Sequence, residues 1–172
     1  MNAPDIFIID LNSVKSGTET RSCVLDDDFF RSVGSQTVRG GNVRANISIS
    51  KDTKECTAVF RLEGSVKVPC DRCLELMDIP INATRTLEIK TGEAYSDEGD
   101  AITLDRRSPV LDTHWIVYEF IALEIPIAHA HAEGACDAQM MEALSQHLAG
   151  GEKAEGRANP CWDKLKDIII NN

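Results

Sequence analysis

The chain has 172 residues, 42% of them apolar and only 5% aromatic, so one compact domain with an aliphatic core is expected. No apolar run approaches the roughly 20 residues needed to span a bilayer, and the N-terminus lacks the basic start and apolar run of a secretory signal, which predicts a cytoplasmic protein without membrane association. Residues 91–172 hold 6 Lys/Arg against 15 Asp/Glu and carry most of the net charge of −10, which disfavours nonspecific binding to nucleic-acid phosphates and suits either a solvated surface or contact with a basic partner.

Residues 1–42 predict a strand followed by a short helix. Ile6–Leu11 is an apolar run typical of a strand. Three acidic residues, Asp26–Asp28, precede the apolar pair Phe29–Phe30, and acidic side chains stabilise the positive end of a helix dipole. Gly40–Gly41 then indicates a break in regular structure.

Residues 43–104 predict an antiparallel sheet. From Val43 to Ser50 apolar and polar residues alternate, as in a strand with one buried face. Further strands are expected over residues 56–62, 66–68, 77–89 and, as a short one, 102–104. Between them we expect a polar turn over 51–54, a kink or bulge at Gly64–Ser65 and an acidic loop over 92–100.

Residues 109–172 predict a mainly helical part. We expect a helix from Asp112 or Thr113 to about Glu124, an irregular segment over 127–138, a short helix over 140–148, a linker over 149–158 and a last helix opened by Asn159–Pro160. Residues 1–172 are therefore predicted to form a single α+β domain, in which an antiparallel sheet in the first half packs with helices from the second half.

Six cysteines in a chain without a secretory signal indicate reduced thiols, and the pair Cys70–Cys73 has the spacing of half a zinc site. Cys136 and Cys161 follow downstream, and His129 or His131, which closely precede Cys136, can replace one ligand. Two interpretations stay open: a structural zinc site, or a knuckle of reduced thiols without metal. A thioredoxin-type redox pair is disfavoured, because a strand rather than a helix is expected after the pair.

His129 and His131 invite a second interpretation, as metal ligands or a general base. The alternative, which we favour, is that one imidazole is exposed while the other packs on the preceding helix. The sequence has no glycine-rich phosphate loop, no Gly-x-Ser-x-Gly elbow and no HExxH motif. We therefore expect a protein that is not an enzyme; the alternatives are a metal-dependent hydrolase or nuclease using these histidines and cysteines, or a metal-free protein-interaction module.

Three blocks in order, Val66–Leu74, Glu119–Cys136 and Asn159–Leu165, give the sequence its resemblance to a known family. From about residue 40 to its end the chain resembles the YceD family, whose bacterial members are called large ribosomal RNA accumulation proteins. The resemblance implies a non-enzymatic factor that supports accumulation or processing of large-subunit (23S) ribosomal RNA, or ribosome assembly. It also implies a ribosomal protein or pre-ribosomal particle as the partner, with direct RNA contact left open.

The resemblance bears on the candidate metal ligands as well. Cys70 and Cys73 match the family's cysteine pair, His131 its histidine and Cys136 the cysteine that follows. Cys161 stands where relatives carry another residue, so the resemblance gives it no support as a ligand. Two ligand sets for zinc therefore remain, Cys70/Cys73/Cys136/Cys161 and Cys70/Cys73/His131/Cys136.

Overall fold

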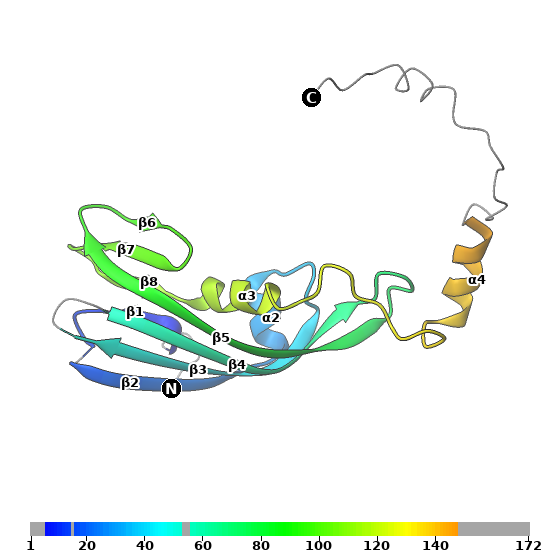
Figure 1. The fold of residues 1–172 in the computed structure, drawn as a ribbon, viewed down its shortest axis with the longest axis horizontal. Coiled ribbons are helices and arrows are strands. Elements are labelled where there is room, and N and C mark those ends of the chain that lie inside the picture. Colours follow the sequence, from blue (N-terminus) through cyan, green and yellow to red (C-terminus); the bar gives the residue numbers. More distant parts are fainter. Residues whose placement is uncertain (1–5, 15, 53–55, 148–172) are drawn as a thin grey trace, which may run out of the picture. The chain divides into compact units, whose positions relative to one another are not determined.

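The computed structural model describes residues 6–14, 16–52 and 56–147 (Figure 1). The chain divides into two compact units, residues 1–137 and 138–172. No helix within the described ranges is long and apolar enough to cross a membrane.

A six-stranded sheet forms most of the first unit, with the strand order β2-β3-β4-β5-β7-β6. Its strands are β2 (Gly17–Leu25), β3 (Gly40–Lys51), β4 (Cys56–Pro69), β5 (Leu76–Gly92), β6 (Ser96–Asp97) and β7 (Ala101–Asp105). Strands β3, β4 and β5 pair antiparallel, as the sequence predicted. Strand β2, which the sequence did not predict, pairs antiparallel with β3. Strand β7 pairs with β5 in parallel, which corrects the expectation of a purely antiparallel sheet. The reason lies in residues 93–100, which carry the chain back along β5 before β7 begins and contain β6, antiparallel to β7.

Alternation of apolar and polar residues places the core on one face of this sheet. In β3 the apolar residues of the pattern, Val43, Ala45, Ile47 and Ile49, are fully buried. The polar residues between them lie on the opposite, wetter face. A sheet covered on one side only requires this pattern, because burying each apolar side chain contributes about 1.5–3 kcal/mol.

Gly64 in β4 allows the neighbouring strand to approach closely. The register between β3 and β4 is unbroken from Gly40↔Lys67 to Lys51↔Cys56, so the bulge expected at Gly64 does not form. Instead Gly64 has a φ of +154°, and a Cβ built there would lie 2.1 Å from the carbonyl oxygen of Asn42. Glycine is needed here because the backbone of β3 occupies the space of a side chain.

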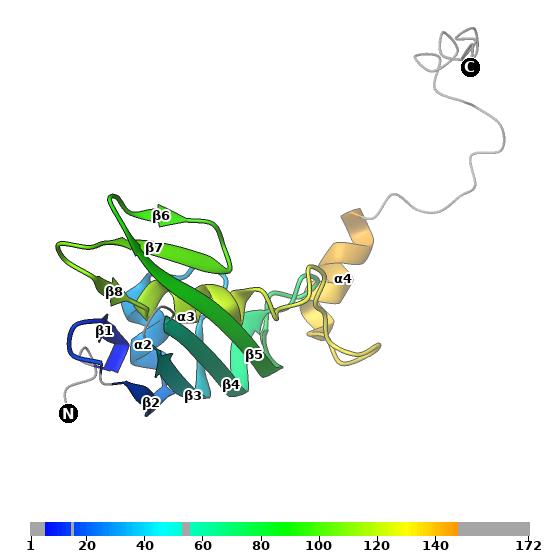
Figure 2. The same ribbon diagram turned by 60° about the vertical axis from the view of Figure 1, so that its left-hand side comes forward.

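Two helices and a two-stranded sheet cover the buried face (Figure 2). They are α2 (Asp27–Val33), α3 (His114–Ala122) and the antiparallel pair β1 (Ile8–Asp10) and β8 (Val110–Asp112). Helix α2 confirms the prediction from the acidic run, since the carboxylate of Asp26 accepts hydrogen bonds from the backbone N–H groups of Asp28 and Phe29.

Helix α3 belongs to this covering layer and precedes the segment that carries His131 and Cys136. Its residues Val117 and Ile121 are fully buried, and its Phe120 makes an edge-to-face contact with Phe60 of β4. The helix ends at Ala122, two residues before the predicted end, and Leu123 is its C-cap. Its first turn has no side-chain cap, because the Thr113 hydroxyl donates instead to the carbonyl of Phe7, 2.9 Å away.

The described part of the second unit is α4 (Ala138–His147), which has no buried residue. It matches the short helix predicted over residues 140–148, two residues early. The helix predicted from Asn159 and the ligand candidate Cys161 lie outside the described residues. The α+β fold class is confirmed, with the sheet in the first half and helices α3 and α4 after it.

Candidate metal centre

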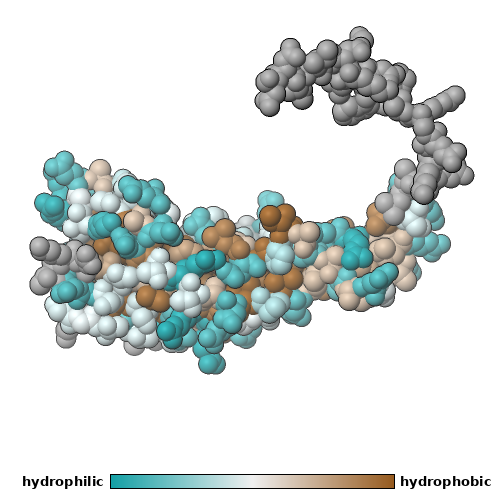
Figure 3. All heavy atoms as spheres, in the orientation of Figure 1, coloured by the Kyte–Doolittle hydropathy of each residue, from teal (hydrophilic) through white to brown (hydrophobic). Residues whose placement is uncertain are grey.

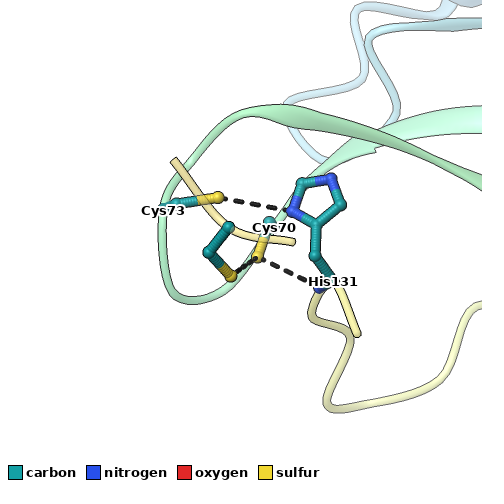
Figure 4. Close-up of side chains that lie close together, drawn as sticks. Cys70, Cys73 and His131 are labelled. Atoms are coloured by element: carbon teal, nitrogen blue, oxygen red, sulfur yellow. Dashed lines mark hydrogen bonds between the residues drawn. The ribbon is translucent and has the colours of Figure 1, made fainter. Parts of the chain in front are cut away.

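The site begins with the turn that joins β4 to β5. The last pair of the two strands is Pro69↔Leu76, so six residues, 70–75, form the connection. Two backbone hydrogen bonds close it: Cys70 N–H donates to Glu75 O at 2.9 Å, and Leu74 N–H donates to Cys70 O at 2.9 Å. This tight turn brings the Cys70 and Cys73 side chains to one side of the loop (Figure 4).

The tight turn forces the backbone of Leu74 into an unfavourable conformation. Its φ is +63°, and Leu74 is the one described residue other than glycine in the left-handed region. A left-handed backbone with a side chain costs roughly 1–2 kcal/mol. The turn therefore carries local strain directly after the second cysteine.

The other half of the site comes from the segment that follows α3. His131 and Cys136 lie in this irregular stretch, far from the knuckle in sequence. His131 Nδ1 lies 3.3 Å from Cys73 Sγ, and Cys136 Sγ lies 4.0 Å from Cys70 Sγ. The ligand atoms of these four residues all lie within 4.8 Å of one another.

Contacts outside the ligand atoms fasten this segment to the knuckle. Asp71 N–H donates to the carbonyl of His129 at 2.9 Å, and His129 N–H donates back to the Asp71 carboxylate at 2.7 Å. The guanidinium of Arg72 donates to the carbonyl of His131 at 3.0 Å. The two residues between the cysteines thus position the histidine, because each bonds to its segment.

His129 does not join the cluster. Its Nδ1 lies 2.9 Å from the carbonyl of Pro126, and its Nε2 lies 3.6 Å from the Asp71 carboxylate. His129 was a candidate metal ligand and general base from the sequence, but its imidazole contacts Pro126 and Asp71 and not the thiols. His131 is the histidine that points at the thiols (Figure 4).

The thiols of the metal-free site differ in acidity. Burial raises the pKa of Cys70, but hydrogen bonds from the backbone N–H groups of Cys73, Arg72 and His131 outweigh it, and the pKa falls to about 5. Burial, the hydrogen bonds to Cys73 and Cys70 and their charge all raise the pKa of Cys136. A thiolate that accepts several N–H groups is the form in which cysteine binds a metal.

The arrangement fits a tetrahedral zinc ion. Ligand atoms about 2.0–2.3 Å from a tetrahedral ion lie about 3.3–3.8 Å from one another, and the two distances given above, 3.3 and 4.0 Å, are close to this. Three sulfurs and one imidazole nitrogen form a donor set that favours zinc over calcium or magnesium. Because four protein ligands fill a tetrahedron, such a site is of the closed, structural type.

Of the candidates from the sequence, the structure brings Cys70, Cys73, His131 and Cys136 together and leaves His129 beside them. Cys161 lies outside the described residues. Of the other described cysteines, Cys56 is buried in β4 and Cys23 is half-buried in β2. The positioning roles of Asp71 and Arg72 were missed; their place between two candidate ligands was the signal for them.

The site lies in the part of the chain that matches a known protein family. The sequence matches the family described as Large ribosomal RNA subunit accumulation protein YceD over residues 58–169. The chain belongs to the YceD family. The match contains the whole four-residue site as well as Cys161, and the family description ties the chain to accumulation of large-subunit ribosomal RNA.

A second similarity is short and covers little of the other protein. Over 78 residues the chain is 28% identical to the flagellar hook protein FlgE of Helicobacter pylori. This stretch is 45% of the chain but only 10% of the hook protein. The similarity therefore does not extend to most of the hook protein. No solved structure matches the chain.

Proposed function

We propose that this YceD-family protein is a non-enzymatic factor that supports accumulation of 23S ribosomal RNA, and that zinc held by Cys70, Cys73, His131 and Cys136 stabilises its fold. Membership of the family carries the first part of this proposal. The four converging ligand atoms support the second part. The protein would act through contact with a ribosomal protein or a pre-ribosomal particle, in the cytoplasm.

The chemistry of the site supports a structural role over a catalytic one. A catalytic zinc needs three protein ligands and an open position for water. Here the fourth position can be filled by a protein side chain, and the thiols of Cys70 and Cys73 are buried at 0% and 3% exposure. His129, the second group that a hydrolase would use, already bonds to Pro126 and faces Asp71.

The proposal is tested by depleting the protein and quantifying both large ribosomal RNAs. We expect the ratio of 23S to 16S RNA to fall and to recover when the wild-type chain is supplied. The variant Cys70→Ser should restore it poorly, because the metal-free fold is less stable. Cys23→Ser is the matched control and should restore it fully, because Cys23 lies in β2, outside the cluster.

Two results would count against the proposal. An unchanged RNA ratio on depletion rejects the role in RNA accumulation. Full recovery with Cys70→Ser, together with wild-type protein lacking zinc, rejects the metal-stabilised fold but leaves the role in RNA accumulation standing.

A further inference from the structure

Helix α3 is apolar on nearly every side, although only one side of it is buried. Of its nine residues, only Glu119 has an acidic side chain and only His114 a basic one. Val117 and Ile121 are buried against the core, as expected for the inner face. A helix that is apolar all round normally has neighbours all round. Within residues 6–137, as far as the structure describes them, no element covers the outer face of α3.

The outer face forms a ridge with a defined composition. Trp115, Glu119 and Leu123 follow one another at four-residue spacing and therefore lie on one side of the helix. Trp115 is 53% exposed and Leu123 is 71% exposed. Ile127, in the segment that follows, is fully exposed at 103%. We call Trp115, Glu119, Leu123 and Ile127 the outer ridge.

The surroundings make the outer ridge an unusual surface for a monomer. Figure 3 shows brown, apolar side chains gathered along the middle of the face in view, in the region where Figure 1 places α3 and the segment after it. Single exposed apolar residues are normal, whereas a contiguous group that includes a tryptophan is typical of a binding surface. Half-buried Ile116 and Phe120 border the ridge and extend the apolar area.

The segment of the chain that carries the outer ridge has charged side chains of one sign. Residues 108–137 contain five Asp/Glu and no Lys or Arg. Glu124 is paired with Arg85. Glu119 accepts a hydrogen bond from the indole N–H of Trp115 at 2.6 Å and forms no ion pair with a cation in the part of the chain that the structure describes. An exposed carboxylate is thus held in the middle of an apolar strip, against the tryptophan ring.

This combination selects one class of occupant. We propose that the outer ridge docks a basic amphipathic segment of a partner protein, whose apolar residues cover Trp115, Leu123 and Ile127 while a Lys or Arg beside them pairs with Glu119. Nucleic acid and anionic membranes are disfavoured, because phosphates would meet an acidic surface. A second copy is disfavoured, because a symmetric contact would bring two Glu119 carboxylates together.

The identity of the partner as a ribosomal or pre-ribosomal protein rests on the proposed function; the docking surface itself does not. An amphipathic helix binds a partner surface through apolar residues at i, i+3, i+4 and i+7, which lie on one of its faces. Trp115 has the residue type most enriched among dominant contacts of interfaces.

The test uses the full chain and three synthetic peptides of about 18 residues, or about five helical turns. The first has leucines on one helical face and lysines or arginines on the others. The second has the same composition in scrambled order, and the third has glutamates in place of the basic residues. Binding is followed by peptide anisotropy and, in a Trp162→Phe background, by the emission of Trp115, the other of the chain's two tryptophans.

We expect the basic amphipathic peptide to bind saturably and to shift the Trp115 emission to shorter wavelength. The scrambled and acidic peptides should bind about tenfold more weakly or worse. The double variant Leu123→Ser/Ile127→Ser, which leaves the net charge unchanged, should lose affinity by about tenfold or more. Glu119→Gln should lose less affinity and weaken its dependence on salt.

The matched control is Val24→Ser, which removes an apolar residue that is 55% exposed on β2, outside the ridge. It should bind the basic peptide like the wild type. Unchanged affinity in the double variant, or equal affinity for the scrambled peptide, overturns the proposal. A wild-type dimer in sedimentation that the double variant converts to monomer also overturns it, since the occupant is then a second copy.

The same double variant separates this proposal from the proposed function. If the peptide binds the ridge specifically but depletion leaves the 23S to 16S ratio unchanged, the docking surface stands and the role in RNA accumulation fails. If depletion lowers the ratio and the double variant restores it fully, the RNA role stands and the ridge is not its docking site.

Discussion

At the scale of single residues, the knuckle already has the backbone that a metal ion requires. The N–H groups that surround Cys70 lower its pKa to about 5 without any ion. Asp71 and Arg72, between the two cysteines, hold the segment that carries His131 in place. The site is therefore preorganised in the absence of metal, which reduces the conformational entropy that is lost when the ion binds.

The first prediction concerns the fourth ligand. Zinc content of purified protein should be one equivalent in the wild type and in Cys161→Ser, and should be strongly reduced in Cys136→Ser and His131→Ala. The reason is that His131 Nδ1 lies 3.3 Å from Cys73 Sγ, as a tetrahedral ligand should. Elemental analysis measures this directly; loss of zinc in Cys161→Ser together with its retention in His131→Ala would assign the site to the four-cysteine set.

The second prediction concerns pH. Zinc binds the thiolate, and the raised pKa of Cys136 keeps its thiol protonated at pH 7 in the metal-free protein. Binding must therefore release a proton, and affinity should fall as the pH falls. The decline should steepen below a pH of about 5, where Cys70 also becomes protonated. Calorimetric titration at pH 7 in buffers of different ionisation enthalpy counts the released protons, and a count of zero contradicts the assignment.

Leu74 gives the third prediction. Because its φ is +63° and its side chain is 65% exposed, Leu74→Gly removes strain and loses little packing. We expect the free energy of unfolding to rise by about 0.5 kcal/mol or more, after the larger chain entropy of glycine is subtracted. Leu76→Gly, at the start of β5 and without a positive φ, is the control and should destabilise by about 1 kcal/mol. Thermal unfolding compares the two; equal losses would show that the left-handed turn is not strained.

At the scale of elements, the packing of β3 on β4 depends on one missing side chain. Gly64→Ala places a methyl group 2.1 Å from Asn42 O and 2.8 Å from Val43 Cα, and both are backbone atoms. The strands must separate, so we predict a loss of about 3 kcal/mol or more in the free energy of unfolding. The fourth prediction is checked by urea denaturation with an unchanged slope.

Gly34→Ala is the matched control for this substitution. Gly34 also has a positive φ, +71°, but nothing lies within 4 Å of its added Cβ. The backbone strain alone should cost about 1 kcal/mol. A similar loss in both variants would mean that backbone conformation, and not the approach of β3, explains the glycine at position 64.

The same elements show what the sequence can predict. Strands β3, β4 and β5 were expected because each has one buried face, which leaves an alternating pattern in the chain. The parallel pairing of β7 and the pairing of β1 with β8 were not expected, because the choice of partner for a short strand depends on the packing of distant elements. The cysteines and His131 were candidates from their spacing and from the family resemblance. The hydrogen bonds between Asp71 and His129 join segments far apart in sequence and leave no periodic pattern in the chain, so only the structure shows them.

At the scale of the whole molecule, the first unit contains the sheet, its covering layer and all four clustered ligands. The described part of the second unit, α4, buries no residue. The fifth prediction is that a chain of residues 1–137 unfolds cooperatively, with a free energy of unfolding within about 1 kcal/mol of the full chain. It should also keep its zinc, although it lacks Cys161. Chemical denaturation with metal analysis decides; loss of metal would show that residues 138–172 complete the site.

The contact between the knuckle and the segment after α3 has a consequence for the topology of the chain. Cys70 and Cys136 are 66 positions apart in sequence. An ion bound by both would act as a crosslink that closes one large loop containing β5 to β8 and α3. By the chain-entropy reasoning used for disulfides, closing a loop of this length contributes about 4 kcal/mol, which is comparable to the whole net stability of many domains. Unlike a disulfide, this crosslink opens when the ion is withdrawn, so the supply of free zinc would set how much of the protein stays folded.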